Sequence, residues 1–244
     1  MIVKLLDLSQ KIFICIGLFN ITSIDCVTGI RDFLEACTKH RKNLQSIDLT
    51  YSKSVTDWGL STLMACPDLD PNKILSTTKG DLFVEAVTKH RPGTAYLDLN
   101  NCGAVTDGAL ALLLEGCPKL DPDKIVSLNK GSRFVRAVAT HRPNLTEINL
   151  AECEGVSDEA LAMLVTTCTT LQPDTIASTK KGDLFLDALA THHKDLEKLD
   201  ISGCADITDA GLARLVEGCP KIPVDSITLP QRGDLFLQAL ATHH

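Results

Sequence analysis

The chain has few aromatic residues, because Phe, Trp and Tyr together make up 4% of its 244 residues. Hydrophobic residues of all kinds make up 44%, so the core must be aliphatic, built mainly from Leu, Ile, Val and Ala. The chain also lacks an excess of positive charge, since its formal net charge at pH 7 is −7. A protein that binds nucleic acid needs a basic stripe that displaces counterions from the phosphates, and this sequence shows none. We therefore expect no nucleic acid among its partners.

The sequence also lacks an apolar run long enough to span a membrane, which takes about 20 residues. Its most apolar segment, residues 12–19, follows a lysine and resembles the core of a secretory signal peptide. However, Asp7 lies upstream and no small-residue cleavage site follows. In a second interpretation, the triplet at residues 6–8 repeats the pattern of residues 199–201. We interpret residues 1–23 as a degenerate N-terminal repeat or cap, and a signal-like segment of a secreted protein is the alternative.

A short pattern recurs at intervals of about 51 residues. Each copy has a strand-like triplet, then a Thr-Asp or Ser-Asp pair, a helical apolar run and a cysteine. An internal period of this length is typical of a stacked array, which presents an extended surface and seldom builds a catalytic cleft. The triplets are Ile47-Asp48-Leu49, Leu97-Asp98-Leu99, Ile148-Asn149-Leu150 and Leu199-Asp200-Ile201.

The cysteines fall into columns of this repeat. Neighbouring strands lie about 4.8 Å apart, so copies two strands apart are separated by about 10 Å. A disulfide needs Cα atoms within about 7 Å, and zinc needs four converging ligands, so the spacing favours neither. We predict buried free thiols, which fit a reducing, cytoplasmic location. The first column is Cys66, Cys117, Cys168 and Cys219, and the second is Cys102, Cys153 and Cys204.

Each period contains two strand–helix units of about 25 residues. In residues 145–195, Ile148 and Leu150 alternate as on the inner face of a strand. Ser157 stands where a helix N-cap is expected, and an apolar stripe follows it at helical spacing. The second half has a short strand near Ile176 and a second helix after a Gly-Asp turn. Stacking such units would bury the exposed side of each strand and helix.

The shape of the stack follows from the widths of its elements. Helices are about 10 Å wide while strands pack about 4.8 Å apart, so the stack must bend with its strands inside the curve. We therefore predict an α/β array over residues 24–244, with a parallel sheet on the concave face and helices on the convex face. The sequence stops within a repeat, so we expect no C-terminal cap.

Residues 196–220 (LEKLDISGCADITDAGLARLVEGCP) resemble the cysteine-containing subtype of leucine-rich repeat. Residues 97–118 carry nearly the same motif, and the intervening half-units resemble a second, more divergent leucine-rich repeat. Alternation of two unit types is similar to the ribonuclease-inhibitor arrangement. The resemblance implies a leucine-rich-repeat solenoid, a curved right-handed superhelix of strands and helices. It also implies a protein that binds other proteins, as the substrate-recognition subunits of F-box ubiquitin ligases do.

The sequence shows no set of residues suited to catalysis. A histidine column is best explained as helix termination, since positive charge there opposes the negative helix end. The Thr-Asp column is explained as N-capping, and the Gly-Asp pairs are too short for a phosphate-binding loop. We predict that the chain is no enzyme and binds neither cofactor nor metal. The histidine column comprises His40, His90, His141, His192 and His243.

The best candidate for a functional surface is the outward side of the strands. Acidic rows alternate there with neutral or apolar rows, a pattern that suits a protein or peptide carrying basic and apolar side chains. Both tyrosines of the chain fall on this side, and tyrosine is enriched among interface anchors. The alternative is that the acids are simply solvated. The candidate partner-binding residues are Asp48, Tyr51, Tyr96, Asp98, Asn100, Glu147, Asn149, Glu152 and Asp200.

These observations predict a monomeric, non-enzymatic interaction scaffold. The alternative is a substrate-recognition fragment of an F-box-type ubiquitin ligase or of a defence receptor whose effector module is missing, although no F-box is recognisable in this sequence.

Overall fold

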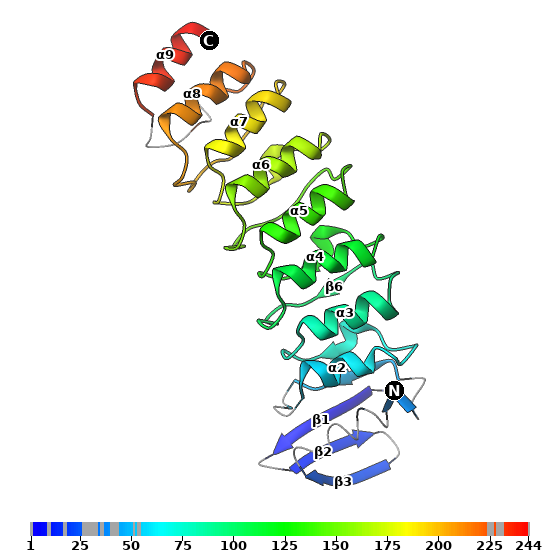
Figure 1. Ribbon diagram of the computed structural model, residues 1–244. Coiled ribbons are helices and arrows are strands. Elements are labelled where there is room, and N and C mark those ends of the chain that lie inside the picture. The colour runs from blue at the N-terminus through cyan, green and yellow to red at the C-terminus, as the bar shows by residue number, and fades with distance from the viewer. Residues whose placement is uncertain are drawn as a thin grey trace. The chain divides into compact units, whose positions relative to one another are not determined.

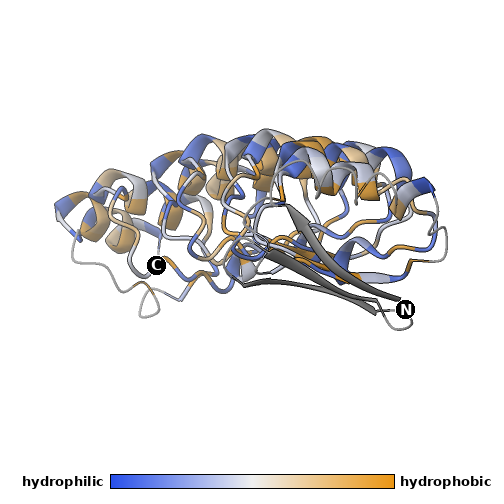
Figure 2. Ribbon diagram, turned by 90° about the horizontal axis from the view of Figure 1, so that it is seen from below, coloured by the Kyte–Doolittle hydropathy of each residue, from blue (hydrophilic) through white to orange (hydrophobic). Residues whose placement is uncertain are grey.

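The computed structural model describes residues 2–8, 11–16, 19–25, 34, 37–39, 44–50, 52, 55–223, 227 and 232–243. The chain forms two compact units, Met1–Ser127 and Leu128–His244, which we call unit 1 and unit 2. In each unit, helices lie side by side along one side, and the short strands and turns lie along the other (Figures 1 and 2). The structure is therefore a repeat fold of helices and short strands, as the sequence predicts.

Unit 1 contains the strands that pair in parallel. Strand β4 (Ser46–Asp48) pairs with β5 (Ile74–Leu75), and β6 (Leu97–Asp98) pairs with β7 (Ile125–Val126). Short 3-10 turns precede β5 and β7, at Pro71–Lys73 and Pro122–Lys124. The helices of unit 1 are α2 (Asp57–Leu63), α3 (Asp81–His90) and α4 (Asp107–Gly116).

Unit 2 repeats this plan with less regular strands. Its strand side includes a parallel bridge between Asn149 and Ala177 and a 3-10 turn at Pro173–Thr175. No longer strand forms among the described residues of unit 2. The helices are α5 (Ser132–His141), α6 (Asp158–Thr167), α7 (Asp183–His192), α8 (Asp209–Gly218) and α9 (Asp234–His243).

Among the described residues, the parallel strands are divided between two sheets. They form a sheet of order β3-β2-β1-β4-β5 and a separate sheet of β6 and β7. The Asn72 side chain accounts for the break beside β6. Its Nδ2 donates to the Tyr96 carbonyl at 2.9 Å, and its Oδ1 accepts from the Asp98 amide at 2.8 Å. A side chain thus takes the hydrogen bonds that a neighbouring strand would otherwise supply.

The described residues of the N-terminal segment form three strands. Strands β1 (Ile2–Leu8), β2 (Lys11–Ile16) and β3 (Phe19–Asp25) pair antiparallel in sequence order, and β1 pairs in parallel with β4. The register places Val3 opposite Ile47. The assignment of residues 1–23 as a degenerate N-terminal repeat or cap stays a prediction.

The helices begin and end where the sequence places them. The side chains of Thr56, Thr106, Ser157 and Thr208 each accept a hydrogen bond from the backbone N–H three residues later, at 3.2–3.4 Å. His90, His141, His192 and His243 are the last residues of α3, α5, α7 and α9. His40, the fifth member of that column, lies outside the described residues. Both kinds of helix end are thus confirmed for the described copies.

Carboxylates join several of these helices to the next. Asp57, at the start of α2, accepts from the backbone N–H groups of Gly80 at 2.7 Å, Leu82 at 2.9 Å and Phe83 at 3.0 Å. These are N–H groups at the start of α3, which has no side-chain N-cap of its own. Asp158 and Asp209 make the same three bonds to the starts of α7 and α9. Each of these aspartates therefore stabilises two helices. It stabilises the helix that it begins through its negative charge, and the following helix through hydrogen bonds to that helix's first N–H groups.

The core is aliphatic, as the composition predicts. Side chains such as Leu60, Leu113, Leu164 and Leu215 are fully buried between the helices and the strand side. The cysteines from Cys37 to Cys219 are buried and free, and the thiols of Cys117, Cys168 and Cys219 lie within 3.5–3.7 Å of backbone carbonyls. Burial raises the pKa of Cys219 to about 11, so this thiol stays protonated near neutral pH.

Ser52 stands at a position where later copies carry Cys102, Cys153 and Cys204. Among the buried side-chain oxygens and nitrogens of the described residues, only the Ser52 Oγ has no hydrogen-bond partner. Burying an unpaired hydroxyl costs about 1–3 kcal/mol, whereas a thiol loses little on burial. We expect Ser52→Cys to raise the free energy of unfolding by about 1 kcal/mol, measured by urea denaturation. The reciprocal change Cys102→Ser should lower it, and a Ser52→Cys variant less stable than the wild type would contradict this assignment.

Candidate functional site

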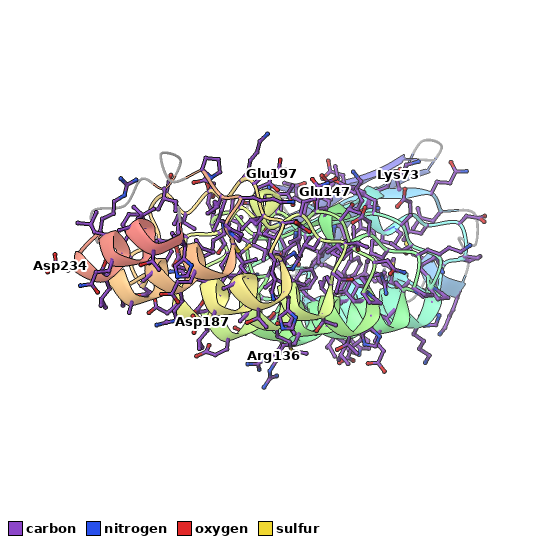
Figure 3. The ribbon with its side chains drawn as sticks, turned by 90° about the horizontal axis from the view of Figure 1, so that it is seen from above. Lys73, Arg136, Glu147, Asp187, Glu197 and Asp234 are labelled. Atoms are coloured by element: carbon purple, nitrogen blue, oxygen red, sulfur yellow. The ribbon has the colours of Figure 1, made fainter. Side chains whose placement is uncertain are left out.

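The outward side of the strand segments is the surface that the sequence singles out, and we call it the strand face. It consists of the outward side chains of residues 46–50, 75–77, 96–101, 126–128, 147–152, 177–179 and 198–203. In unit 2, Glu147 points to this side, away from Arg136 and Asp187 on the helix side (Figure 3). Because the two units are described separately, the strand face is described as two parts.

Aspartate and asparagine side chains on the strand face close turns by accepting a hydrogen bond from the backbone. The Oδ1 of Asp48 accepts from the Thr50 amide at 3.1 Å and from the Thr50 hydroxyl at 2.8 Å. Asp98, Asn149 and Asp200 make the equivalent bond to the amide two residues later, each at 2.9 Å. The backbone and side-chain hydrogen bonds from Ser202 lower the pKa of Asp200 below its ordinary value. Each side chain thus uses one oxygen to hold the end of the strand segment.

The residue three positions after Asp98, Asn149 and Asp200 has an unusual backbone in each case. Asn101, Glu152 and Gly203 have φ angles of 58°, 61° and 73°, in the left-handed region that favours glycine and asparagine. Glu152 is therefore held in a conformation that costs about 1 kcal/mol or more. The conformation turns the chain from the strand segment toward the following helix and places the Glu152 side chain on the exposed surface.

In unit 1, the strand face brings four candidate residues together. A hollow of about 250 Å³ is lined by Asp98 and Asn100 and by the polar side chains of Thr50 and Asn72. A neighbouring hollow of about 490 Å³ adjoins Asp48. Leu75 is 51% exposed and Tyr96 is 42% exposed, so apolar and aromatic surface borders the acids. Tyr51, which was expected on the same face, lies outside the described residues.

In unit 2, Glu147, Asn149, Glu152 and Asp200 are exposed. The bridge between Asn149 and Ala177 places an exposed neutral residue beside the polar row. The nearest described ion pair joins Glu154 and Lys180 at 2.5 Å. The exposed groups of this part are mainly acidic, as the sequence predicts, while its capacity to bind a partner stays a prediction.

Beneath the strand face runs a column of buried lysines that the sequence analysis missed. Lys79, Lys130 and Lys181 are only 4%, 5% and 2% exposed. Their ammonium groups lie 5.3–5.8 Å from the ring centres of Phe83, Phe134 and Phe185, within range of a cation–π interaction. The signal was present, because a Lys-Gly pair recurs at residues 79–80, 130–131 and 181–182.

Two of these lysines hydrogen-bond to the backbone of the aspartates that close turns on the strand face. Lys79 Nζ donates to the Asp98 carbonyl at 3.3 Å, and Lys181 Nζ donates to the Asp200 carbonyl at 2.5 Å. Desolvation by burial lowers the pKa of Lys79, and the charges of Cys102, Asp98 and Asp70 act in the opposite direction. Desolvation likewise lowers the pKa of Lys181. Each ammonium group therefore fixes the backbone of a candidate binding residue without reaching the surface.

Searches for other kinds of site gave no candidate. Within the part of the chain that the structure describes, no three His, Cys, Asp or Glu side chains converge as metal ligands would. No described helix combines the length and the apolar character that a membrane span requires.

Comparisons with known proteins identify one repeat directly. Residues 192–216 match the family described as Leucine Rich repeat. A curated relative, the Antagonist of mitotic exit network protein 1 of Eremothecium gossypii, is 33% identical over 90 residues. That match covers 35% of this chain and 22% of the relative, so the chain matches about a fifth of that protein's length.

Among solved structures, the crystal structure of a Rad7 and Elc1 complex in yeast contains a similar chain. The similarity has a TM-score of 0.34 at 11% sequence identity. It covers 79% of this chain and 65% of the other chain.

Proposed function

Because this chain is a leucine-rich-repeat protein, we propose that it is a non-enzymatic scaffold that binds a protein or peptide on its strand face. The observation that carries the proposal is the exposure of Leu75 and Tyr96 beside Asp48 and Asp98 in unit 1. Large apolar side chains exposed next to fixed charges are typical of interaction surfaces. The buried core around them gives this surface a rigid base.

The proposed binding surface is the inside of a curve. Helices are wider than the spacing of strands, so stacked units bend with the strand face on the concave side and the helices on the convex side. We extend this right-handed solenoid over residues 24–244, with residues 1–23 as an N-terminal cap. A concave surface would let several rows of side chains contact one partner at once.

The proposed partner carries basic and apolar side chains. Asp48, Asp98 and Asp200 use Oδ1 for their turns, and a second carboxylate oxygen remains on each to attract lysine or arginine. Tyr96 and Leu75 would contact the apolar side chains of the partner. The buried free thiols fit a reducing, cytoplasmic location. The net charge of −7 fits a partner other than nucleic acid, and we propose that the chain is a monomer.

We expect the combined changes Asp48→Asn, Asp98→Asn and Asp200→Asn to weaken partner binding at least tenfold. Asn149 already closes the same turn with an amide oxygen, so asparagine removes the charge and keeps the turn. Loss of three charges from the interface then reports on electrostatic attraction rather than on folding. The measurement is the dissociation constant for a partner isolated from native cells by affinity purification.

The matched control changes Glu85, Glu115 and Glu217 to Gln, which removes the same charge from exposed positions on the helices. This control should bind the partner as the wild type does. Equal affinity of the strand-face variant and the wild type would exclude the proposed surface.

The second candidate is a substrate-recognition part of an F-box-type ubiquitin ligase or of a defence receptor. The cysteine-containing motif at residues 196–220 favours it, as does the short share of the curated relative that the chain matches. The sequence of the full-length transcript decides between the two, because an F-box or a nucleotide-binding segment in the same reading frame would support the second candidate.

A further inference from the structure

The residue that follows α3 is an arginine, whereas the residue that follows α7 is a histidine, and this difference changes the surface around the two helix ends. Arg91 follows α3, and its guanidinium donates to the Cys66 carbonyl, to the Leu69 carbonyl at 3.5 Å and to the His90 carbonyl at 2.8 Å. It therefore bridges the end of α2 and the end of α3. At the position 102 residues later, the residue is His193.

His193 makes a different contact. Its Nε2 lies 2.8 Å from the Val165 carbonyl in the last turn of α6. The imidazole side chain is shorter than the arginine side chain. The residues of unit 2 that correspond to Cys66 and Leu69, whose carbonyls accept from Arg91, are Cys168 and Leu171. No guanidinium is present at this position to bridge the ends of α6 and α7.

A second bridge is also missing at this place. In unit 1 the Asn72 side chain joins the 3-10 turn before β5 to Tyr96 and Asp98. In unit 2 the corresponding residue is Asp174, whose carboxylate cannot donate to the Lys198 carbonyl. The structure describes no corresponding hydrogen bond from Asp174, although residues 169–198 lie wholly within its described part.

An open hollow lies where both bridges are missing. Its volume is about 610 Å³, and residues 169–174 and 192–198 line it. Leu171 and Lys198 are among its lining residues, and Asp174 and Glu197 add carboxylates. Asp195, also on its wall, is paired with Lys221 at 2.6 Å. The hollow therefore offers backbone carbonyl acceptors and the carboxylates of Asp174 and Glu197, with Lys194 and Lys198 also in its lining. Carbonyls and carboxylates are the partners of a planar cation with several N–H donors.

We propose that this hollow binds a guanidinium group, presented by an arginine side chain of a protein partner. The guanidinium would occupy the place that Arg91 fills in unit 1, with Asp174 and the Leu171 carbonyl as acceptors. A guanidinium fits better than an ammonium group, because its fork of donors can reach a carboxylate and a carbonyl together. The site adds a second contact region that does not depend on the acids of the strand face.

The test uses the full chain and two small probes, N-acetyl-arginine methylamide and its citrulline analogue, which has the same shape without the charge. Backbone amide signals of residues 170–174 and 194–198 are followed by NMR during each titration. We expect saturable shifts with the arginine probe and at least tenfold weaker binding of the citrulline probe, since hydrogen bonds to charged groups contribute about 1.5–3 kcal/mol. Equal midpoints for the two probes would overturn the proposal.

The matched variant combines His193→Arg with Asp174→Asn, which restores the two bridging side chains of unit 1. Because the chain already accommodates both residues at the equivalent positions, we expect the variant to fold and to lose the shifts caused by the arginine probe. The single change His193→Arg should also block the hollow and serves if the double variant does not fold. Undiminished binding of the arginine probe to a folded variant would contradict the assigned site.

Discussion

Replacing Asp158 with Ala is expected to lower the free energy of unfolding by about 2–3 kcal/mol. The carboxylate accepts from the amides of Gly182 at 2.7 Å, Leu184 at 2.9 Å and Phe185 at 3.0 Å. Gly182 and Phe185 are buried, so their N–H groups would lose their only described acceptor away from water. Urea denaturation followed by circular dichroism measures the loss.

The same change should also loosen one specific junction. Because units of an array contact mainly their neighbours, hydrogen exchange should increase at the start of α7 before it increases in α5. Asp158→Asn keeps one acceptor oxygen but presents an NH₂ group to an N–H donor, so its loss of stability should be intermediate. Glu217→Ala, on an exposed position of α8, is the control and should change the free energy of unfolding by less than about 0.5 kcal/mol. If the Asp158→Ala variant has the same free energy of unfolding as the wild type, the capping role of Asp158 is excluded.

Replacing Lys181 with Ala is expected to lower the free energy of unfolding by about 2–4 kcal/mol. The change removes a buried stem, the contact with the Phe185 ring and the hydrogen bond to the Asp200 carbonyl. Lys181→Met fills the same space without a charge, so it should be close to neutral, because a buried charge carries a desolvation cost that an apolar side chain does not. Equal losses for the two variants would show that the ammonium group itself, and not the packing of its stem, stabilises this region.

The free energy of unfolding should also depend on pH differently in the wild type and in the Lys181→Met variant. Burial lowers the pKa of Lys181 in the folded chain below its ordinary value of 10.5. Between the lowered pKa and 10.5 the unfolded chain binds more protons than the folded chain, so this lysine makes stability rise with pH over that window. The difference in unfolding free energy between the wild type and Lys181→Met should therefore shift in favour of the wild type as pH rises toward 10.5. A constant difference would mean that the folded pKa is not lowered.

The repeat plan could be predicted because it is written in local signals. Ser157 and its equivalents cap helices through a bond to a residue three positions away, and His192 and its equivalents end helices by local charge and geometry. Signals of this kind depend on neighbours in sequence, so they are visible without a structure. The break in the sheet beside β6 was not visible, because it depends on Asn72 reaching residues 24 to 26 positions away.

The exposure of several candidate residues could be predicted, but the hydrogen bonds that they make could not. The alternation of side chains correctly placed Tyr96 and Glu147 on the exposed surface. It did not show that Asp48 and Asp98 each spend an oxygen on a turn, since that depends on the path of the chain after the strand. The buried lysines were missed because a lysine in a Lys-Gly pair looks like part of a solvated turn. Only the packed Phe83 and Phe185 rings show why the ammonium groups lie inside.

Hydrogen–deuterium exchange on the complex with an isolated protein partner tests the proposed function most directly. The proposal predicts slower exchange on binding in residues 46–50, 96–101, 147–152 and 198–203, with little change in the exposed faces of α3, α6 and α8. Protection confined to those helices, with the strand segments unchanged, would contradict it.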